Sequence, residues 1–221
     1  MADEQDLLLR EIDEELKQEN LQKIWKKYGT LIVAGSIALV AAVAGFKGWQ
    51  SYELNQRIEQ GERFAAAQKL AGDGKADAAR DAFAAMAEDS TAGYTMLARF
   101  QLAALAANSG DTAGAVGSYQ AIADDGAVAD VYRDLAVVLG ALAEIDSKAG
   151  AGALTARAEQ LVQGSSPWRF SAKEVSALAA MKNGDNKTAR MRYDELAKEA
   201  AAPQGLRTRA GEMLNVLPGG K

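Results

Sequence analysis

The sequence predicts an all-α protein in which one N-terminal transmembrane helix is followed by an α-solenoid of about four helix pairs and a C-terminal capping helix. Three observations support this prediction. Alanine supplies 47 of the 221 residues and proline only three, which favours closely packed helices over sheets. An uncharged run of 19 residues lies near the N-terminus, and a short phrase recurs along the rest of the chain.

The composition excludes several kinds of site. The chain has no cysteine and no histidine, which excludes disulfides, thiol nucleophiles, Ser-His-Asp catalysis and the common zinc sites. The net charge of −5 argues against a nucleic-acid partner, because proteins that bind nucleic acid present a basic face. We therefore expect no catalytic residues, no metal site, no cofactor and no enzymatic activity.

The first predicted element is a transmembrane helix. Residues 28–46 contain no charged side chain, and as a helix they would span about 28 Å, close to the thickness of the hydrocarbon core. Aromatic residues flank this run at both ends, where interfacial anchors belong. They are Trp25, Tyr28, Trp49 and Tyr52.

A cleaved signal peptide is the alternative interpretation of the apolar run. Ala42-Val43-Ala44 has the small-x-small pattern that signal peptidase accepts. However, the 27 residues before the run carry eight acidic side chains, whereas signal peptides begin short and basic. An uncleaved anchor therefore fits the sequence better.

The flanking cations predict the orientation of this anchor. Five lysine and arginine residues lie within the 20 residues before the span and three within the 20 after it, and Lys23, Lys26 and Lys27 stand directly at the first boundary. The positive-inside rule then places the N-terminus in the cytoplasm. We expect an acidic cytoplasmic tail over 1–27, a transmembrane helix over 28–48 and a periplasmic repeat domain over 49–221, in a bacterial inner membrane.

The acidic tail has a weak helical pattern. Leu9, Ile12 and Leu16 fall on one face of a helix, with acids around the rest. This acidity disfavours binding to an anionic leaflet. A juxtamembrane helix that contacts a cytoplasmic or ribosome-side partner and a solvated helix without a partner both fit this pattern.

Small residues recur within the span. Ala34, Ala38 and Ala42 are spaced every four residues, and we call them the small-residue stripe. Such a stripe lets a second helix approach closely, which makes it a candidate contact with another membrane helix. Because alanine is common throughout the chain, a stripe without a partner is the alternative.

The recurring phrase has the form G-x4-A-x3-[FY]-x2-[MIL]-A. Its three clear copies run over residues 74–87, 110–123 and 184–197. The glycines are 36 and then 74 residues apart, and a degenerate copy with Leu154, Ala158 and Leu161 fits the gap. A spacing in the mid-thirties is the length of one helix–turn–helix unit.

Each position of the phrase has a physical role. The glycine ends the first helix in a left-handed turn. The alanine lies where two helices cross, and the aromatic and aliphatic residues fill the groove to the neighbouring repeat. The predicted repeat-core residues are Ala79, Phe83, Met86, Ala115, Tyr119, Ile122, Ala189, Tyr193 and Leu196.

The first helix of each pair should precede the glycine turn. We expect these helices over 50–70, 94–107, 128–145 and 168–181, with Ser166 as the N-cap and Pro167 at the first position of the fourth helix. Pro203 should open a last helix over 204–217, which caps the open end of the array.

Three stretches of the chain carry a resemblance to a known family. The first stretch enters the span with Trp25-Lys-Lys-Tyr28-Gly29 and leaves it with Gly48-Trp49. The second runs from Pro167-Trp168-Arg169 to Gly184-Asp185. The third runs from Pro203-x-Gly205-Leu206-Arg207 to Leu214. The small and aromatic spacing is that of tetratricopeptide-like repeats. The whole arrangement resembles YfgM-type ancillary subunits of the SecYEG translocon.

This resemblance implies a tetratricopeptide-like fold and a function. It implies a membrane-tethered scaffold that associates with the SecYEG translocon and a membrane-anchored periplasmic prolyl isomerase, and that assists emerging secretory proteins. The residues by themselves indicate an anchored helical array that binds protein. A scaffold for another envelope process, such as cell division, cell-wall synthesis or cytochrome maturation, remains the alternative.

Three motifs with apparent catalytic chemistry have a simpler interpretation. Gly72-Asp73-Gly74-Lys75 lacks both the earlier glycine, where Lys69 stands, and the following Ser or Thr, where Ala76 stands, of a phosphate loop. We interpret it as a repeat turn. The acid pairs Glu88-Asp89 and Asp124-Asp125 lack the alternating ligands of a calcium loop, and we interpret them as solvated turn charges.

Trp168 and Arg169 are the candidate protein-binding residues. Trp and Arg dominate the energetics of many protein interfaces, and these two residues begin the helix predicted over 168–181. The alternative, which we favour for Trp168, is a buried wedge between two helices.

Overall fold

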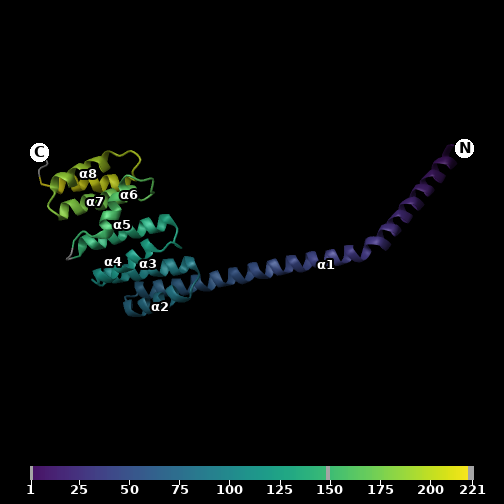
Figure 1. The fold of residues 1–221 in the computed structure, drawn as a ribbon, viewed down its shortest axis with the longest axis horizontal. Coiled ribbons are helices and arrows are strands. Elements are labelled where there is room, and N and C mark those ends of the chain that lie inside the picture. Colours follow the sequence, from purple (N-terminus) through teal and green to yellow (C-terminus); the bar gives the residue numbers. More distant parts are fainter. Residues whose placement is uncertain (1, 148–149, 219–221) are drawn as a thin grey trace. The chain divides into compact units, whose positions relative to one another are not determined.

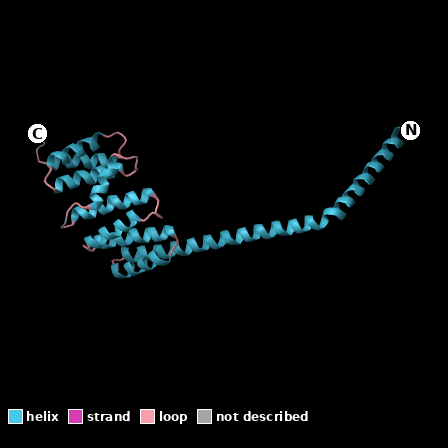
Figure 2. Cartoon of the chain, viewed as in Figure 1, coloured by secondary structure: helices cyan, strands magenta, loops and turns pink. Residues whose placement is uncertain are grey.

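The computed structural model describes the backbone of residues 2–147 and 150–218, and the side chains of these residues except for 2–24 and 32. Over this part of the chain the structure contains α-helices joined by loops and turns, with no strand (Figure 2). The helices are α1 (Ala2–Gly72), α2 (Ala76–Asp89), α3 (Ala92–Asn108), α4 (Thr112–Asp124), α5 (Asp130–Asp146), α6 (Ala153–Val162), α7 (Arg169–Lys182), α8 (Asn186–Lys198) and α9 (Gln204–Val216). The prediction of an all-α protein with an apolar N-terminal helix and a helical repeat domain is confirmed.

The chain forms two units, Met1–Glu59 and Gln60–Lys221. The described residues of the first unit, 2–59, all belong to α1. From Trp25 onward, this helix contains an apolar window that is long enough to cross a membrane and that is almost wholly unburied. The side chains of Leu9, Ile12 and Leu16 lie outside the described residues.

The second unit is a stack of helix pairs (Figure 1). The last part of α1 precedes α2 as the first pair, and α3–α4, α5–α6 and α7–α8 follow, with α9 as a single final helix. Each helix from α2 onward packs against the next. The first helices of the third and fourth pairs, α5 and α7, also contact each other, and α7 contacts the final helix α9. This is the architecture of an α-solenoid, in which each unit buries its apolar face against its neighbours.

The turns inside three pairs have the predicted left-handed glycine. Gly74, Gly110 and Gly184 have φ values of 77°, 82° and 80°, which residues with a Cβ rarely adopt. At Gly110 the amide donates to the carbonyl of Ala107 at 3.1 Å, and the next amide donates to the carbonyl of Ala106 at 2.9 Å. These are the two hydrogen bonds of a Schellman motif.

The residue after the glycine begins the second helix of the pair. The carboxylate of Asp111 accepts from the amide of Gly114 at 3.0 Å, and Asp185 accepts in the same way from Thr188. Both are N-caps. The residue at this position in the first pair is Lys75, which makes no such bond.

The third pair has a different turn. Glu144, near the end of α5, is 7% exposed, and its carboxylate accepts hydrogen bonds from the amides of Gly152, Leu154 and Thr155 at 2.8–3.0 Å. A side chain from the first helix thereby caps the second helix. In the degenerate copy, Leu154 and Ala158 are buried and Leu161 is half-buried.

The start of α7 corrects one prediction. Helix α7 begins at Arg169, and Trp168 rather than Ser166 is at its N-cap position. The Ser166 hydroxyl donates to Asp134 on α5 at 2.7 Å and accepts from the amide of Trp168 at 3.2 Å. An N-cap serine would make the same bond to the amide two residues on, but Pro167 and Trp168 form a turn and the helix begins only at Arg169.

Candidate protein-binding surfaces

The nine repeat-core residues all lie in the interior. Each is at most 5% exposed, and the three alanines of the phrase are fully buried. They fall into three apolar clusters, one in the first pair, one across the middle of the array and one around α8 and α9. Burial also raises the pKa of the Tyr119 and Tyr193 phenols. These residues contribute to packing and leave surface recognition to other side chains.

Trp168 is half-buried between α5 and α7. Its ring packs against the middle cluster, and its indole nitrogen donates to the carbonyl of Val131 at 2.7 Å. The adjacent Val131 and Tyr132 are exposed large side chains. The Arg169 guanidinium lies 4.1 Å from the centre of the Phe170 ring, which is a cation–π distance.

A groove of about 740 Å³ opens beside the turns of the second and third pairs. Ala113, Val116 and Ala151 contribute apolar surface to it, and Asp111 and Glu144 line it as well. Both carboxylates already accept backbone amides at the start of a helix. This groove was not predicted from the sequence, because it depends on how the turns of two pairs are stacked.

The two acid pairs are largely neutralised by arginine. Asp89 bonds Arg63, Asp124 bonds Arg157 and Asp125 bonds Arg99, with N–O distances of 2.6–3.1 Å. The carboxyl pKa of Asp124 is lowered by hydrogen bonds from Gln120 and Arg157, and that of Asp125 by the amide of Ala127 and by Arg99. We interpreted these acids from the sequence as solvated turn charges, but three of the four form ion pairs with arginine.

Ion pairs also connect the second helices of successive pairs. Arg157 on α6 bonds Asp124 at the end of α4, and Arg192 on α8 bonds Glu159 on α6 at 2.6 Å. Glu159 also accepts from the buried Ser176 hydroxyl of α7. Burial acts to raise the pKa of Glu159, but the bonds from Arg192 and Ser176 outweigh it, and the pKa is lowered.

The motif at residues 72–75 is a turn, as its spacing predicts. The amide of Lys75 donates to the carbonyl of Leu70 at 2.9 Å, and Gly74 has the left-handed conformation. Among the described residues, no group of three or more acidic side chains is placed to hold a metal ion.

The small-residue stripe lies on the apolar part of α1. Ala34, Ala38 and Ala42 are all exposed. Large apolar side chains such as Ile37, Leu39 and Val40 on the same helix are also at least 65% exposed. A bilayer or another helix would cover such a surface.

The geometry defines a class of protein. A stack of two-helix units with a left-handed glycine at each tight turn and a small alanine at each crossing is a tetratricopeptide-like solenoid. The family described as "Tetratricopeptide repeat-like domain" matches residues 22–213. The chain belongs to this family. No curated protein and no solved structure matches the chain.

Proposed function

We propose that this protein is a non-enzymatic, membrane-tethered scaffold that associates with the SecYEG translocon and assists the trafficking or folding of secreted proteins in the periplasm. The observation that carries the proposal is the continuity of α1. The helix that contains the exposed apolar window ends at Gly72, inside the first repeat pair. A membrane that is spanned by the apolar window therefore also tethers the repeat array.

Tethering favours weak and transient binding. An array confined to the membrane has a high effective concentration toward anything docked at a neighbouring membrane complex. A modest affinity for emerging chains then suffices, and neither ATP nor a cofactor is required. The family membership supports a protein partner in general, and the resemblance of the flanks and of residues 167–185 to YfgM-type subunits supports the translocon and a membrane-anchored prolyl isomerase in particular.

The proposed topology follows from the lysines before the span. With the N-terminus in the cytoplasm and the repeat array in the periplasm of a bacterial inner membrane, protease added outside that membrane should digest the chain after Trp49 and leave the tail intact. A mature protein that begins near Gly45 would instead identify a signal peptide. A protected repeat array would reverse the proposed orientation.

Affinity purification in mild detergent tests the partners. The full-length protein should recover the translocon and the prolyl isomerase. A chain without residues 50–221 should lose the isomerase and secretory substrates but keep the translocon if the small-residue stripe is a docking face. Changing the stripe to leucine tests that face, and the matched control changes Val33, Ile37 and Val40 to leucine in the same span.

Another envelope process is the competing function, because the tetratricopeptide-like fold is compatible with many protein partners. Recovery of division, cell-wall or cytochrome-maturation proteins in place of the translocon would support that function and contradict the secretion proposal.

A further inference from the structure

Helix α1 carries a heptad pattern that begins in the apolar run and continues beyond it. From Val33 to Ile58, residues spaced alternately by four and three share one face of the helix. In heptad notation they occupy the a and d positions, and we call this face the α1 seam. Six of its eight residues are apolar, and all eight are exposed. They are Val33, Ile37, Val40, Ala44, Lys47, Ser51, Leu54 and Ile58.

The outer part of the α1 seam lies where lipid tails do not cover it. The proposed span ends at residue 48, so Leu54 stands about 9 Å beyond it at 1.5 Å per residue, and Ile58 stands farther out. These side chains are 56% and 51% exposed. A bilayer covers the apolar residues inside the span, but Leu54 and Ile58 face water in a single copy. A second helix along the same face would cover both.

The polar side chains of this segment bond one another on the opposite face. The indole nitrogen of Trp49 donates to Glu53 at 3.2 Å, and the amide of Gln56 donates to the hydroxyl of Tyr52 at 2.8 Å. These four residues occupy the b, c and f positions, which point away from a coiled-coil partner. In the described segment, the polar side chains without a hydrogen bond stand at g, a and e. They are Gln50, Ser51 and Asn55.

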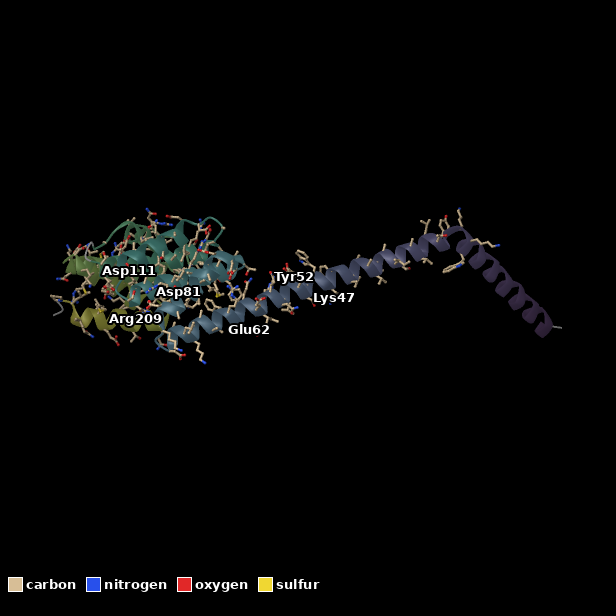
Figure 3. The ribbon with its side chains drawn as sticks, turned by 90° about the horizontal axis from the view of Figure 1, so that it is seen from below. Lys47, Tyr52, Glu62, Asp81, Asp111 and Arg209 are labelled. Atoms are coloured by element: carbon tan, nitrogen blue, oxygen red, sulfur yellow. The ribbon has the colours of Figure 1, made fainter. Side chains whose placement is uncertain are left out.

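A hollow of about 400 Å³ lies on this part of α1. The residues that line it are Lys47, Gln50, Ser51, Glu53, Leu54 and Arg57. Four of them stand at successive d, g, a and d positions, and four such residues form the hole that receives one side chain of the facing helix in a coiled coil. Figure 3 labels Lys47, at the end of the hollow nearest the span, and Tyr52, which is outside the seam.

We propose that α1 binds α1 of a second copy of this chain as a parallel, in-register coiled coil along the α1 seam. Two copies that cross one bilayer in the same direction are already parallel, and their confinement raises the effective concentration of each for the other. A two-fold axis along the membrane normal then makes the contact isologous. The charged seam residue, Lys47, lies at the membrane boundary, where its long stem lets the ammonium group reach the headgroups. The seam ends after Ile58, because a Cβ at the next d position, Gly61, would lie 2.9 Å from the Tyr94 hydroxyl.

Charge complementarity favours a second copy as the occupant. In a parallel pair, the g residue of one helix stands beside the e residue five positions later in the other, and these positions select the partner. Arg57 at g meets Glu62 at e, which has the opposite charge, and Gln50 at g meets Asn55 at e, where two amides can bond. Arg57 bonds only Glu53 of its own helix, at 3.4 Å, and these side chains are 70% and 48% exposed. Such a pair contributes little free energy, so Arg57 is available to a partner.

Disulfide formation between single cysteines tests the α1 seam. The chain has no cysteine, so each variant of the full-length protein, in phosphatidylcholine liposomes at high lipid excess, reports on one position. A disulfide requires Cα atoms within about 7 Å, which the a and d positions of a parallel pair satisfy. The b and f positions lie on the outer sides of helices about 10 Å across and serve as controls. The seam variants are Ser51→Cys, Leu54→Cys and Ile58→Cys, and the controls are Tyr52→Cys and Gln56→Cys.

The yield of disulfide-linked dimer should follow the heptad. Under mild oxidation it should be at least about tenfold higher at each seam position than at the controls. Equal yields at all positions would identify random collisions, and higher yields at the controls would identify the opposite face. The absence of dimer at every position would mean that lipid or another protein covers the seam. Each of these three outcomes would overturn the proposal.

A charge swap tests the register independently. In the Ser51→Cys chain, Arg57→Glu should lower the dimer yield by at least about threefold, because two carboxylates then face each other across the seam. Adding Glu62→Arg to the same chain should restore the yield, which excludes misfolding as the cause of the loss. The matched control, Glu59→Arg, reverses an exposed charge at a b position and should leave the yield unchanged. An undiminished yield with Arg57→Glu alone, or no recovery in the double variant, would contradict the proposed pairing.

Discussion

Gly140 on α5 provides the sharpest test of the packing between pairs. A Cβ placed on this residue would lie 2.3 Å from Cδ1 of Leu154 and 2.9 Å from Cβ of Tyr119. Leu154 is fully buried and Tyr119 is 5% exposed. The glycine is therefore required because α4 and α6 both approach α5 at this point.

Two effects of opposite sign decide the outcome of Gly140→Ala. Alanine is favoured over glycine inside a helix by about 1 kcal/mol. Overpacking of a close-packed core costs about 1–3 kcal/mol, and here the upper part of that range applies, because the Cβ of Tyr119 cannot rotate away. The net loss of unfolding free energy should be roughly 1–2 kcal/mol, which lowers the thermal midpoint by about 2–8 °C for a domain of this size.

Circular dichroism melts of the full-length protein in mild detergent measure this change. The matched control is Gly117→Ala on α4, where an added Cβ meets no atom within 4 Å. This exposed change should raise the midpoint by about 2–4 °C, because only the helix preference acts. An unchanged or higher midpoint for Gly140→Ala would refute the reasoning that α4, α5 and α6 meet at this residue.

Three further predictions concern the interior and the turns. Ala115→Leu should lower the unfolding free energy by about 1–3 kcal/mol through overpacking; an unchanged midpoint in the same melts would contradict its burial at a helix crossing. Glu144→Ala should cost about 1–3 kcal/mol by leaving buried amides at the start of α6 without an acceptor, and Glu144→Gln should cost less; equal midpoints for both variants would contradict the capping role. The lowered pKa values of Asp124 and Asp125 contribute stability that is present above the ordinary aspartate pKa and lost as pH falls through the folded values, so melts between pH 6 and pH 3 should show a smaller loss when both are changed to Asn.

The repeat register was predictable because its determinants are local. A glycine with a left-handed conformation, an alanine five residues later and an aromatic four beyond it define one turn and one crossing. The first helices of the second, third and fourth pairs begin and end within two residues of the predicted bounds, whereas that of the first pair was predicted over 50–70 and is the last part of α1 (Ala2–Gly72). Hydrophobic periodicity gives this information directly. The exposed apolar window of α1 was equally visible, since it depends only on composition over consecutive residues.

The cap of the third pair was not predictable, because it depends on a contact across a turn. Glu144 lies eight to eleven residues before the amides that it accepts, and no capping signature in sequence has that spacing. The start of α7 was predicted too early for a similar reason. Ser166 has an N-cap's side chain, and its hydroxyl donates to Asp134 on α5, but the helix begins only at Arg169, after a turn.

The overall net charge of the chain does not reveal that α2 is acidic and α8 is basic in sum. The sequence as a whole is mildly acidic, at −5, and this average combines charges that the fold separates to opposite ends of a stack. Asp77 and Lys187 become comparable only after the glycines of the first and last pairs are aligned, and both side chains are exposed. An open solenoid is extended in one dimension, so its two ends can differ in charge without any effect on the core, whereas the middle second helices are constrained by the arginine pairs between them.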